Sequence, residues 1–185
     1  MKILTRPAQI RSALRELLSE AADTRIIAVA YVGIDAPSFL TNPSGITLYC
    51  WPQAGATNPH AIDSLLKRGV LVRFANRLHA KVYWSKHRGA LIGSANLTRN
   101  ALGEAALQEA VVWVPPGAFD IQSFAASLDI EPDFDAALKR LHESHVRFMQ
   151  RNPSRHRGGV VATGPKRQSF TEWFSSEGRP EWRLG

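Results

Sequence analysis

The chain has 185 residues, of which 44% are hydrophobic and 21% charged, proportions that exclude a disordered or fibrous protein and suit one domain with a short appendage. The formal net charge of +7 favours a polyanionic partner, and nucleic acid is the first candidate because a basic surface attracts phosphates. A single cysteine, Cys50, and the lack of a basic-then-apolar leader at residues 1–18 indicate a reducing compartment, so we expect a cytoplasmic protein. No apolar run reaches the roughly 18 residues that span a bilayer, so we expect no membrane partner.

Helices and strands alternate through the first part of the chain. Apolar residues at helical spacing, among them Ile10 and Leu14, follow Pro7 and predict an amphipathic helix over residues 7–22. The continuous apolar run at residues 26–32 predicts a strand in the centre of a sheet that is covered on both faces. Shorter runs bounded by Gly and Pro predict strands at 46–51, 70–74, 79–84, 89–93 and 109–114, and a helix at 60–68.

This alternation predicts an α/β fold in which a mixed β-sheet is sandwiched by helices. A Pro-Pro-Gly sequence after residue 114 ends the pattern, so we expect a first domain at residues 1–114 and a helical extension at 115–150 that packs on it. Residues 151–185 place Arg among Gly and Pro with few apolar anchors, which predicts a basic, mobile tail. The C-terminal extension is therefore mainly helical or irregular, with helices expected at 120–128 and 134–150.

Two short motifs bring together residues that suit phosphate chemistry. His79 and Lys81 stand two apart on a predicted strand, so both side chains project from one face of the sheet. Gly93 ends the next predicted strand, and the turn that follows can present Ser94 and Asn96 at the same edge. A nucleophilic imidazole, an ammonium, a hydroxyl and an amide are therefore expected to converge on one phosphate.

In these residues the chain resembles the phospholipase D superfamily, whose signature is His-x-Lys, four residues, Asp, six residues and then Gly-Ser-x-Asn. The resemblance covers residues 79–110 by motif and residues 1–114 as a βα pattern, and it implies a phospholipase D-like fold. One departure is Lys86, which stands where the family has an Asp that is regarded as supporting the turn rather than taking part in the chemistry. The residues at the family spacing are His79, Lys81, Gly93, Ser94 and Asn96.

The resemblance implies a two-step reaction through a phosphohistidine. Neutral His79 attacks phosphorus, a second histidine protonates the departing alkoxide, and water then cleaves the adduct. Lys81, Ser94 and Asn96 would stabilise the charge that develops on the non-bridging oxygens. The scheme needs no cofactor and no metal.

The superfamily also has an acidic residue downstream of the Asn that orients the catalytic histidine. Glu109, at the start of the last predicted strand of the sheet, is the matching candidate, and Glu104 is the alternative. A carboxylate on one imidazole nitrogen fixes the tautomer and leaves the other nitrogen free to attack.

The spacing of His, Cys and carboxylate residues gives no sign of a metal site. His142 and His145 lie one helical turn apart, and we interpret them as part of a polar helix face rather than as a ligand pair.

The motif occurs once in this chain, whereas superfamily enzymes with two motifs pair them inside one polypeptide. We therefore expect a homodimer with its active site at the two-fold interface, where His79 of the partner subunit supplies the second imidazole. Such a coupled pair would be active with one ring neutral and one protonated, which predicts a bell-shaped pH profile. The other histidines lack a companion Lys and a Gly-Ser-x-Asn turn: His60, His87, His142, His145 and His156.

Residues 60–103 contain eight Lys or Arg and only one acid, Asp63. This segment is therefore expected to line a phosphate path. The leading function is a nuclease, with DNA favoured over RNA. Two alternatives stay open: a catalytically silent nucleic-acid-binding module of a defence or repair system, and a phospholipase or phosphatidyl transferase. The candidate substrate-binding residues are Arg73, Arg77, Lys86, Arg88 and Arg99.

Overall fold

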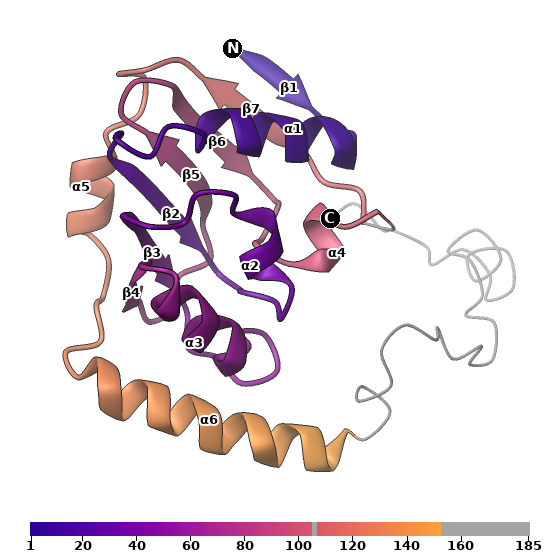
Figure 1. Ribbon diagram of the computed structural model, residues 1–185, viewed down its shortest axis with the longest axis vertical. Helices are drawn as coiled ribbons and strands as arrows, with labels where there is room; N and C mark the ends of the chain where they lie inside the picture. Colours follow the sequence, from indigo (N-terminus) through magenta and orange to yellow (C-terminus); the bar gives the residue numbers. More distant parts are fainter. Residues whose placement is uncertain (105–106, 153–185) are drawn as a thin grey trace, which may run out of the picture. The chain divides into compact units, whose positions relative to one another are not determined.

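The computed structural model describes residues 1–104 and 107–152. Within these residues, seven strands form one mixed sheet (Figure 1) in the order β1-β7-β6-β5-β2-β3-β4. β2, β3 and β4 are parallel, whereas the other neighbouring pairs are antiparallel. The α/β class and the mixed sheet predicted from the sequence are therefore confirmed. The strands are β1 Lys2–Leu4, β2 Arg25–Val29, β3 Ile46–Cys50, β4 Leu71–Phe74, β5 Lys81–Ser85, β6 Gly89–Gly93 and β7 Val111–Val114.

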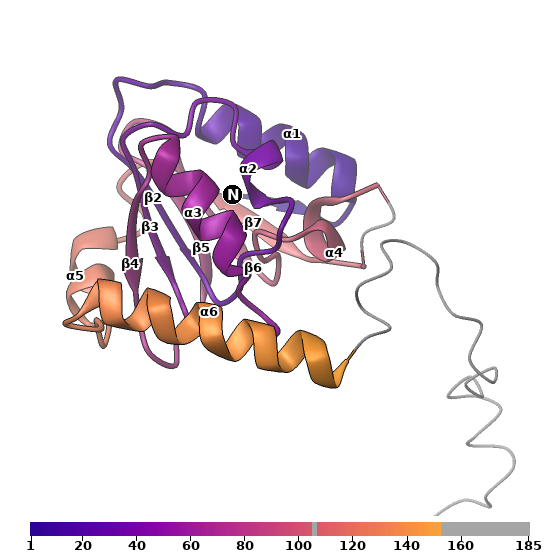
Figure 2. The same cartoon turned by 60° about the horizontal axis from the view of Figure 1, so that its bottom comes forward.

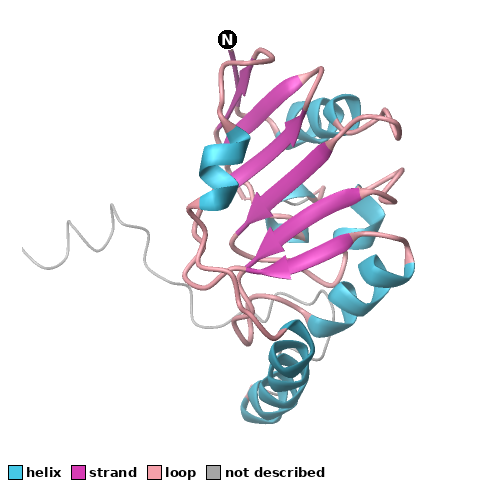
Figure 3. Cartoon of the chain, turned by 90° about the vertical axis from the view of Figure 1, so that its left-hand side faces the viewer, coloured by secondary structure: helices cyan, strands magenta, loops and turns pink. Residues whose placement is uncertain are grey.

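Helices cover both faces of this sheet (Figure 3). One face packs against apolar residues of α1, α3 and α6, such as Leu14, Leu65 and Leu141. The opposite face, which carries Val82, packs against Ile121 and other residues of α5. The helices in chain order are α1 Pro7–Leu17, α2 Ala36–Phe39, α3 Pro59–Lys67, α4 Arg99–Leu102, α5 Ile121–Ala126 and α6 Phe134–Arg151.

Residues 1–151 form one compact unit. α6 lies alongside α3 and β4 (Figures 1 and 2), and its residues Ala137 and Leu141 belong to the same core as the sheet. The segment before α6 covers the edge of β4, where the amide of Glu131 donates to the carbonyl of Phe74. Residues 153–185, which hold most of the predicted basic tail, lie outside the described residues.

Several element boundaries differ from the sequence prediction. β2 ends at Val29 instead of residue 32, and β7 begins at Val111 instead of residue 109, so Glu109 precedes the strand. α1 ends at Leu17 instead of residue 22. The chain turns there, and the buried Arg25 guanidinium donates hydrogen bonds to the carbonyls of Leu18 and Ala21. β5 begins at Lys81, whose register partner is Val29, so residues 79–80 precede the ladder.

Three short elements were not predicted, namely β1, α2 and α4. Each has only three or four residues, too few for a periodic apolar pattern to develop. In the part of the chain that the structure describes, no helix combines the length and apolar character that crossing a bilayer requires.

Candidate active site

Four strand ends lie next to one another along one side of the sheet, the motif edge, and position the motif residues. β2 ends at Val29 directly opposite Lys81, where β5 begins. β6 ends at Gly93 directly opposite Val111, where β7 begins. Because β5 and β6 are themselves paired, the His-x-Lys motif and the Gly-Ser-x-Asn turn are brought to the same edge, as the sequence predicted.

His79 and Lys81 lie side by side. The His79 side chain is exposed, and the Lys81 Nζ atom lies 3.3 Å from its Nε2 atom and 3.5 Å from its Nδ1 atom. Nζ also donates to the backbone carbonyl of His79 at 2.7 Å. Lys81 is only 9% exposed, and this burial lowers the pKa of its ammonium group, an effect that the negative charge of Glu109 opposes. The site thus holds an accessible imidazole against a cation that the protein largely screens from water.

The backbone before His79 takes an unusual path. Arg77 has a φ of 54°, and it is the one non-glycine residue with positive φ in the described part of the chain. A left-handed conformation costs an ordinary residue roughly 1–2 kcal/mol, so the surrounding structure must hold it. Leu78, which is 5% exposed and packs in the core beneath α5, anchors this bend and so sets the position of His79.

Gly93 allows the two strands beside the motif to approach each other closely. A Cβ atom at this position would lie 2.1 Å from the carbonyl oxygen of Ala110, so a larger residue would force the chains apart. The close approach permits the amide of Ser94 to donate to that same carbonyl at 3.1 Å. The turn after β6 is therefore fixed to the chain that leads into β7.

Ser94 connects this turn to Glu109. The Ser94 hydroxyl donates to the Glu109 carboxylate and accepts from the amide of Ala110 at 3.0 Å. Since the hydroxyl has a single proton, Ser94 in this arrangement positions the carboxylate instead of offering a donor to a substrate. Among the described residues, the hydrogen-bond partner of the Glu109 carboxylate is thus Ser94, whereas the resemblance implied the imidazole of His79.

Asn96 is held by Tyr31, a residue that belongs to neither of the two sequence motifs. Its Oδ1 atom accepts from the backbone amide of Tyr31 at 3.1 Å, which leaves the Nδ2 hydrogens as the donors that can serve a ligand. The Tyr31 ring stacks on Trp51 with 6.4 Å between ring centroids and meets the His79 ring edge-on at 6.5 Å. Tyr31 therefore contacts both the amide of Asn96 and the imidazole of His79. The sequence did not indicate this, because Tyr31 falls inside the apolar run predicted as a strand at residues 26–32.

Tyr83 supports the same turn from inside the protein. Its hydroxyl, on a side chain that is 2% exposed, donates to the carbonyl of Ala95 at 3.1 Å. Burial, reinforced by the negative charge of Glu109, raises the pKa of this hydroxyl well above its usual range. The group is therefore protonated and able to donate at neutral pH.

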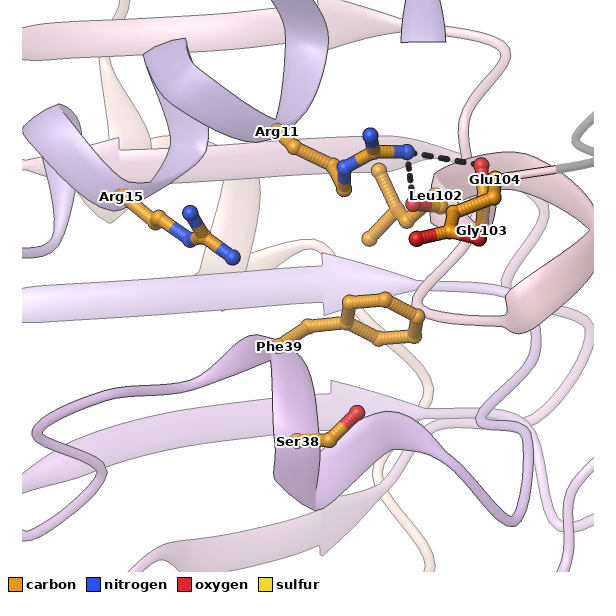
Figure 4. Close-up of a pocket in the computed structure, with 7 residues that line it drawn as sticks. All are labelled: Arg11, Arg15, Ser38, Phe39, Leu102, Gly103 and Glu104. Carbon is orange, nitrogen blue, oxygen red and sulfur yellow. Dashed lines mark hydrogen bonds between the residues drawn. The ribbon is translucent and has the colours of Figure 1, made fainter. Parts of the chain in front are cut away.

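Glu104, the alternative acid, lies in a different place. It lines a hollow of about 300 Å³ between α1 and α4, together with Arg11, Arg15 and Phe39 (Figure 4). Arg11 donates to the carbonyls of Leu102 and Gly103 at 2.9 and 2.7 Å and so fixes the end of α4. Of the two acids, Glu109 is the one that the structure joins to Ser94.

The candidate substrate-binding residues separate into two groups. Arg77 is exposed in the segment that leads to His79, and Arg99 is exposed at the start of α4, directly after the Asn96 turn. Arg73 is exposed on β4, which is separated from β5 by β2 and β3. These three cations lie toward the edge that carries the motifs.

Lys86 and Arg88 are not brought to that edge. They lie in the turn between β5 and β6, at the far end of a five-residue strand that spans roughly 13 Å. Arg88 pairs there with Glu20 at 3.4 Å, so its charge is partly satisfied by a neighbour. The sequence predicted that all five cations line one phosphate path. Lys86 and Arg88 do not belong to that path, because they lie at the other end of β5 and β6.

The turn at Lys86 is supported by an acid from elsewhere in the chain. Asp23, which is 7% exposed, accepts from the Ser85 hydroxyl and from the His87 amide, and its Oδ1 atom lies 3.0 Å from Nδ1 of His87. Burial alone would raise the pKa of Asp23, but these hydrogen bonds and the nearby imidazole outweigh it and hold the pKa below its usual value. No sequence pattern indicated this contact, because Asp23 is 62 residues away from Ser85.

No protein-family model matches the sequence, and no curated protein matches it either. Among solved structures, the chain is similar to NucT from Helicobacter pylori, with 16% identity, a TM-score of 0.46, and coverage of 77% of this chain and 95% of that one. It is also similar to Nuc from Salmonella typhimurium, a phospholipase D family member, with 15% identity, a TM-score of 0.40, and coverage of 80% of this chain and 93% of that one.

Proposed function

We propose that this chain is a phosphodiesterase, most specifically a nuclease, in which His79 is the nucleophile of a metal-independent reaction. The observation that carries the proposal is the contact between an exposed imidazole and a largely buried ammonium, with Lys81 Nζ 3.3 Å from His79 Nε2. The family signature at residues 79–96 gives both groups a role. A merely structural surface has no need of a nucleophile held against a screened cation.

The reaction takes place in two steps. A neutral nitrogen of His79 attacks phosphorus, the bond from phosphorus to the leaving oxygen breaks, and a protonated second histidine gives its proton to that oxygen. The second histidine, now neutral, takes a proton from water, whose oxygen attacks the phosphohistidine and breaks the nitrogen–phosphorus bond. His79 is restored, and the second histidine is again protonated.

The groups around His79 suit the charge that such a reaction develops. Lys81 would bind a non-bridging oxygen, with its charge little screened because the side chain is mostly buried. The Nδ2 group of Asn96, whose Oδ1 atom is already occupied by Tyr31, would donate to a second oxygen. Ser94 and Glu109 are hydrogen-bonded to each other. Ser94 would fix the turn, and the negative charge of Glu109 would favour the charged form of Lys81.

The second histidine comes from another copy of the chain. Two exposed apolar residues flank the segment that carries Asn96: Ile34 is 56% exposed and Leu107 is 65% exposed. Ile34 follows Gly33, whose amide donates to the carbonyl of Leu97, and the Leu107 amide donates to the carbonyl of Asn100. Burying such residues against a second copy would favour association at this edge, where His79 of the partner subunit could reach the same phosphate.

Nucleic acid is the proposed substrate because cations surround the motif edge. Arg77 and Arg99 are exposed beside the motifs, and each would neutralise a backbone phosphate without reading sequence. The net charge of +7 supports either polymer, and we propose DNA as the first substrate to test.

One set of assays tests the activity. Purified protein is incubated in excess EDTA with plasmid, single-stranded DNA, RNA and phosphatidylcholine vesicles, beside His79→Ala and a control variant, His87→Ala, at the opposite edge of the sheet. We expect cleavage of nucleic acid by the wild type and by His87→Ala, and none by His79→Ala. Cleavage of the lipid alone would point to a phospholipase, and binding without cleavage would point to a silent binding module.

A mixing experiment tests the shared site. When subunits of wild type and His79→Ala exchange freely at equal amounts, only about a quarter of the dimers hold two intact histidines. Activity per total protein should therefore fall to about a quarter of the wild-type value instead of about half. A fall to one half, or an active species that stays monomeric at all concentrations, would contradict the two-subunit site.

A further inference from the structure

Two histidines and an aspartate from two helices meet away from the motif edge. His60 and Asp63 lie one turn apart on α3, and His142 reaches them from α6. One ligand atom of each residue lies within 4.8 Å of the other two. The His142 Nε2 atom lies 3.1 Å from Asp63 Oδ2, and His60 Nδ1 lies 4.0 Å from the same oxygen.

These separations are close to those of ligand atoms around a bound transition metal. Four ligands at about 2.1 Å from a zinc ion are roughly 3.4 Å apart, and the two separations just given lie on either side of that value. The final adjustment is within reach, because the His60 side chain is 65% exposed and the other two are about one third exposed. Small side-chain rotations would place all three ligand atoms at bonding distance from one ion.

The backbone already holds two of these residues in position. The side chain of Asn58 caps α3 by accepting from the amides of His60 and Ala61, so the first turn that carries His60 is fixed. His60 and Asp63 at i and i+3 then share one face of the helix. That face is turned toward α6, against which α3 packs.

We propose that His60, Asp63 and His142 bind a divalent transition-metal ion, with zinc as its occupant, and that the ion fixes α6 to α3. Two neutral imidazoles and one carboxylate form a set that suits zinc, whereas magnesium and calcium prefer sites made of oxygen. Water or a fourth side chain would complete the tetrahedron, and the ring of His145 lies 6.0 Å from that of His60. The role is structural, so the metal-independent chemistry at His79 is unaffected.

The test is a zinc titration of chelator-treated, dialysed full-length protein. The His79→Ala background is used throughout, so that imidazoles at the motif edge cannot bind the added ion. We expect one zinc ion per chain in competition with a chromophoric chelator. A hundredfold excess of free zinc over the dissociation constant should raise the Tm by roughly 5–10 °C, whereas magnesium and calcium should not.

Three variants locate the ion. His60→Ala changes an exposed residue and should fold as the parent does, yet lose zinc affinity by more than about 100-fold, since the loss of an outer hydrogen-bond partner alone costs 10–100-fold. His142→Gln keeps a donor for Asp63 but removes the imidazole, and it should lose affinity as strongly. The control His87→Ala should bind zinc as the parent does. Equal affinity in the parent and His60→Ala, or no zinc-dependent rise in Tm, would overturn the proposal.

Discussion

The hydrogen bond from Tyr83 to Ala95 is the internal support of the Ser94–Asn96 turn, and Tyr83→Phe removes it while preserving the ring. The bond is 3.1 Å long and joins two residues that are 2% and 1% exposed. Without it, the Ala95 carbonyl loses a buried partner, which costs about 1–3 kcal/mol. For a folded unit of this size, that corresponds to a fall in Tm of roughly 3–10 °C.

The loss should also reach catalysis, because Ala95 lies between Ser94 and Asn96. If the displaced turn stabilises the transition state by about 1.4 kcal/mol less, kcat/KM falls about tenfold. We would measure thermal unfolding by circular dichroism and nuclease activity at a temperature at which both proteins are fully folded. The phosphodiesterase assay then reports the position of the turn separately from global stability.

Tyr49→Phe is the matched control. Tyr49 lies on β3, and the described residues provide no hydrogen-bond partner for its hydroxyl, so its unfolding free energy should stay within about 0.5 kcal/mol of wild type. If Tyr83→Phe unfolded at the wild-type temperature and cleaved substrate at the wild-type rate, the position of the Ser94–Asn96 turn would not depend on this hydrogen bond.

Three further predictions follow from the backbone and from a buried acid. Gly93→Ala should destabilise the protein by about 1–3 kcal/mol and abolish nuclease activity, because its Cβ would meet the Ala110 carbonyl at 2.1 Å; urea unfolding and the plasmid assay measure both. Asp23→Asn should be less stable than wild type at pH 7, because the folded state lowers the pKa of Asp23; the difference should begin to shrink as the pH falls below about 4 and disappear below the lowered pKa of the folded state, whereas unfolding curves across that range would show a constant difference if the acid were unimportant. Arg77→Gly should keep wild-type stability within about 0.5 kcal/mol, since a φ of 54° suits glycine, yet reduce the salt dependence of DNA binding by about one phosphate contact; an unchanged salt slope would remove Arg77 from the substrate path.

The central sheet was predictable because its strands are continuous or alternating apolar runs with clear turn signals. The run at residues 26–32 became β2, which is in the middle of the sheet and buried on both faces, as a strand of that composition must be. β1 escaped prediction because its three residues gain their structure from pairing with β7, a partner more than 100 residues away. Local pattern carries no information about such pairing.

The site divides in the same way. The two-residue spacing predicted that His79 and Lys81 lie side by side, and their side chains are in contact, although β5 begins only at Lys81 and His79 precedes the strand. Tyr31 and Tyr83 could not be found, since each reaches the site through the fold: one donates a backbone amide to Asn96 across 65 residues, and the other donates its hydroxyl from the core. The cluster around Asp63 was missed for the same reason, because its partner His142 is 79 residues away.

Lys86 departs from the family signature, and its position in the fold shows what this departure affects. Lys86 lies in the turn at the edge of the sheet opposite His79, so a change there removes no group from the reaction. In this chain a carboxylate from elsewhere supports the turn, because Asp23 accepts from the Ser85 hydroxyl and from the amide of His87. A side chain at position 86 is then free to be a lysine, because the hydrogen bonds that the turn requires are made by another residue. Because the Lys86 turn and His79 lie at opposite ends of β5, a lysine at position 86 leaves the groups of the proposed active site in place.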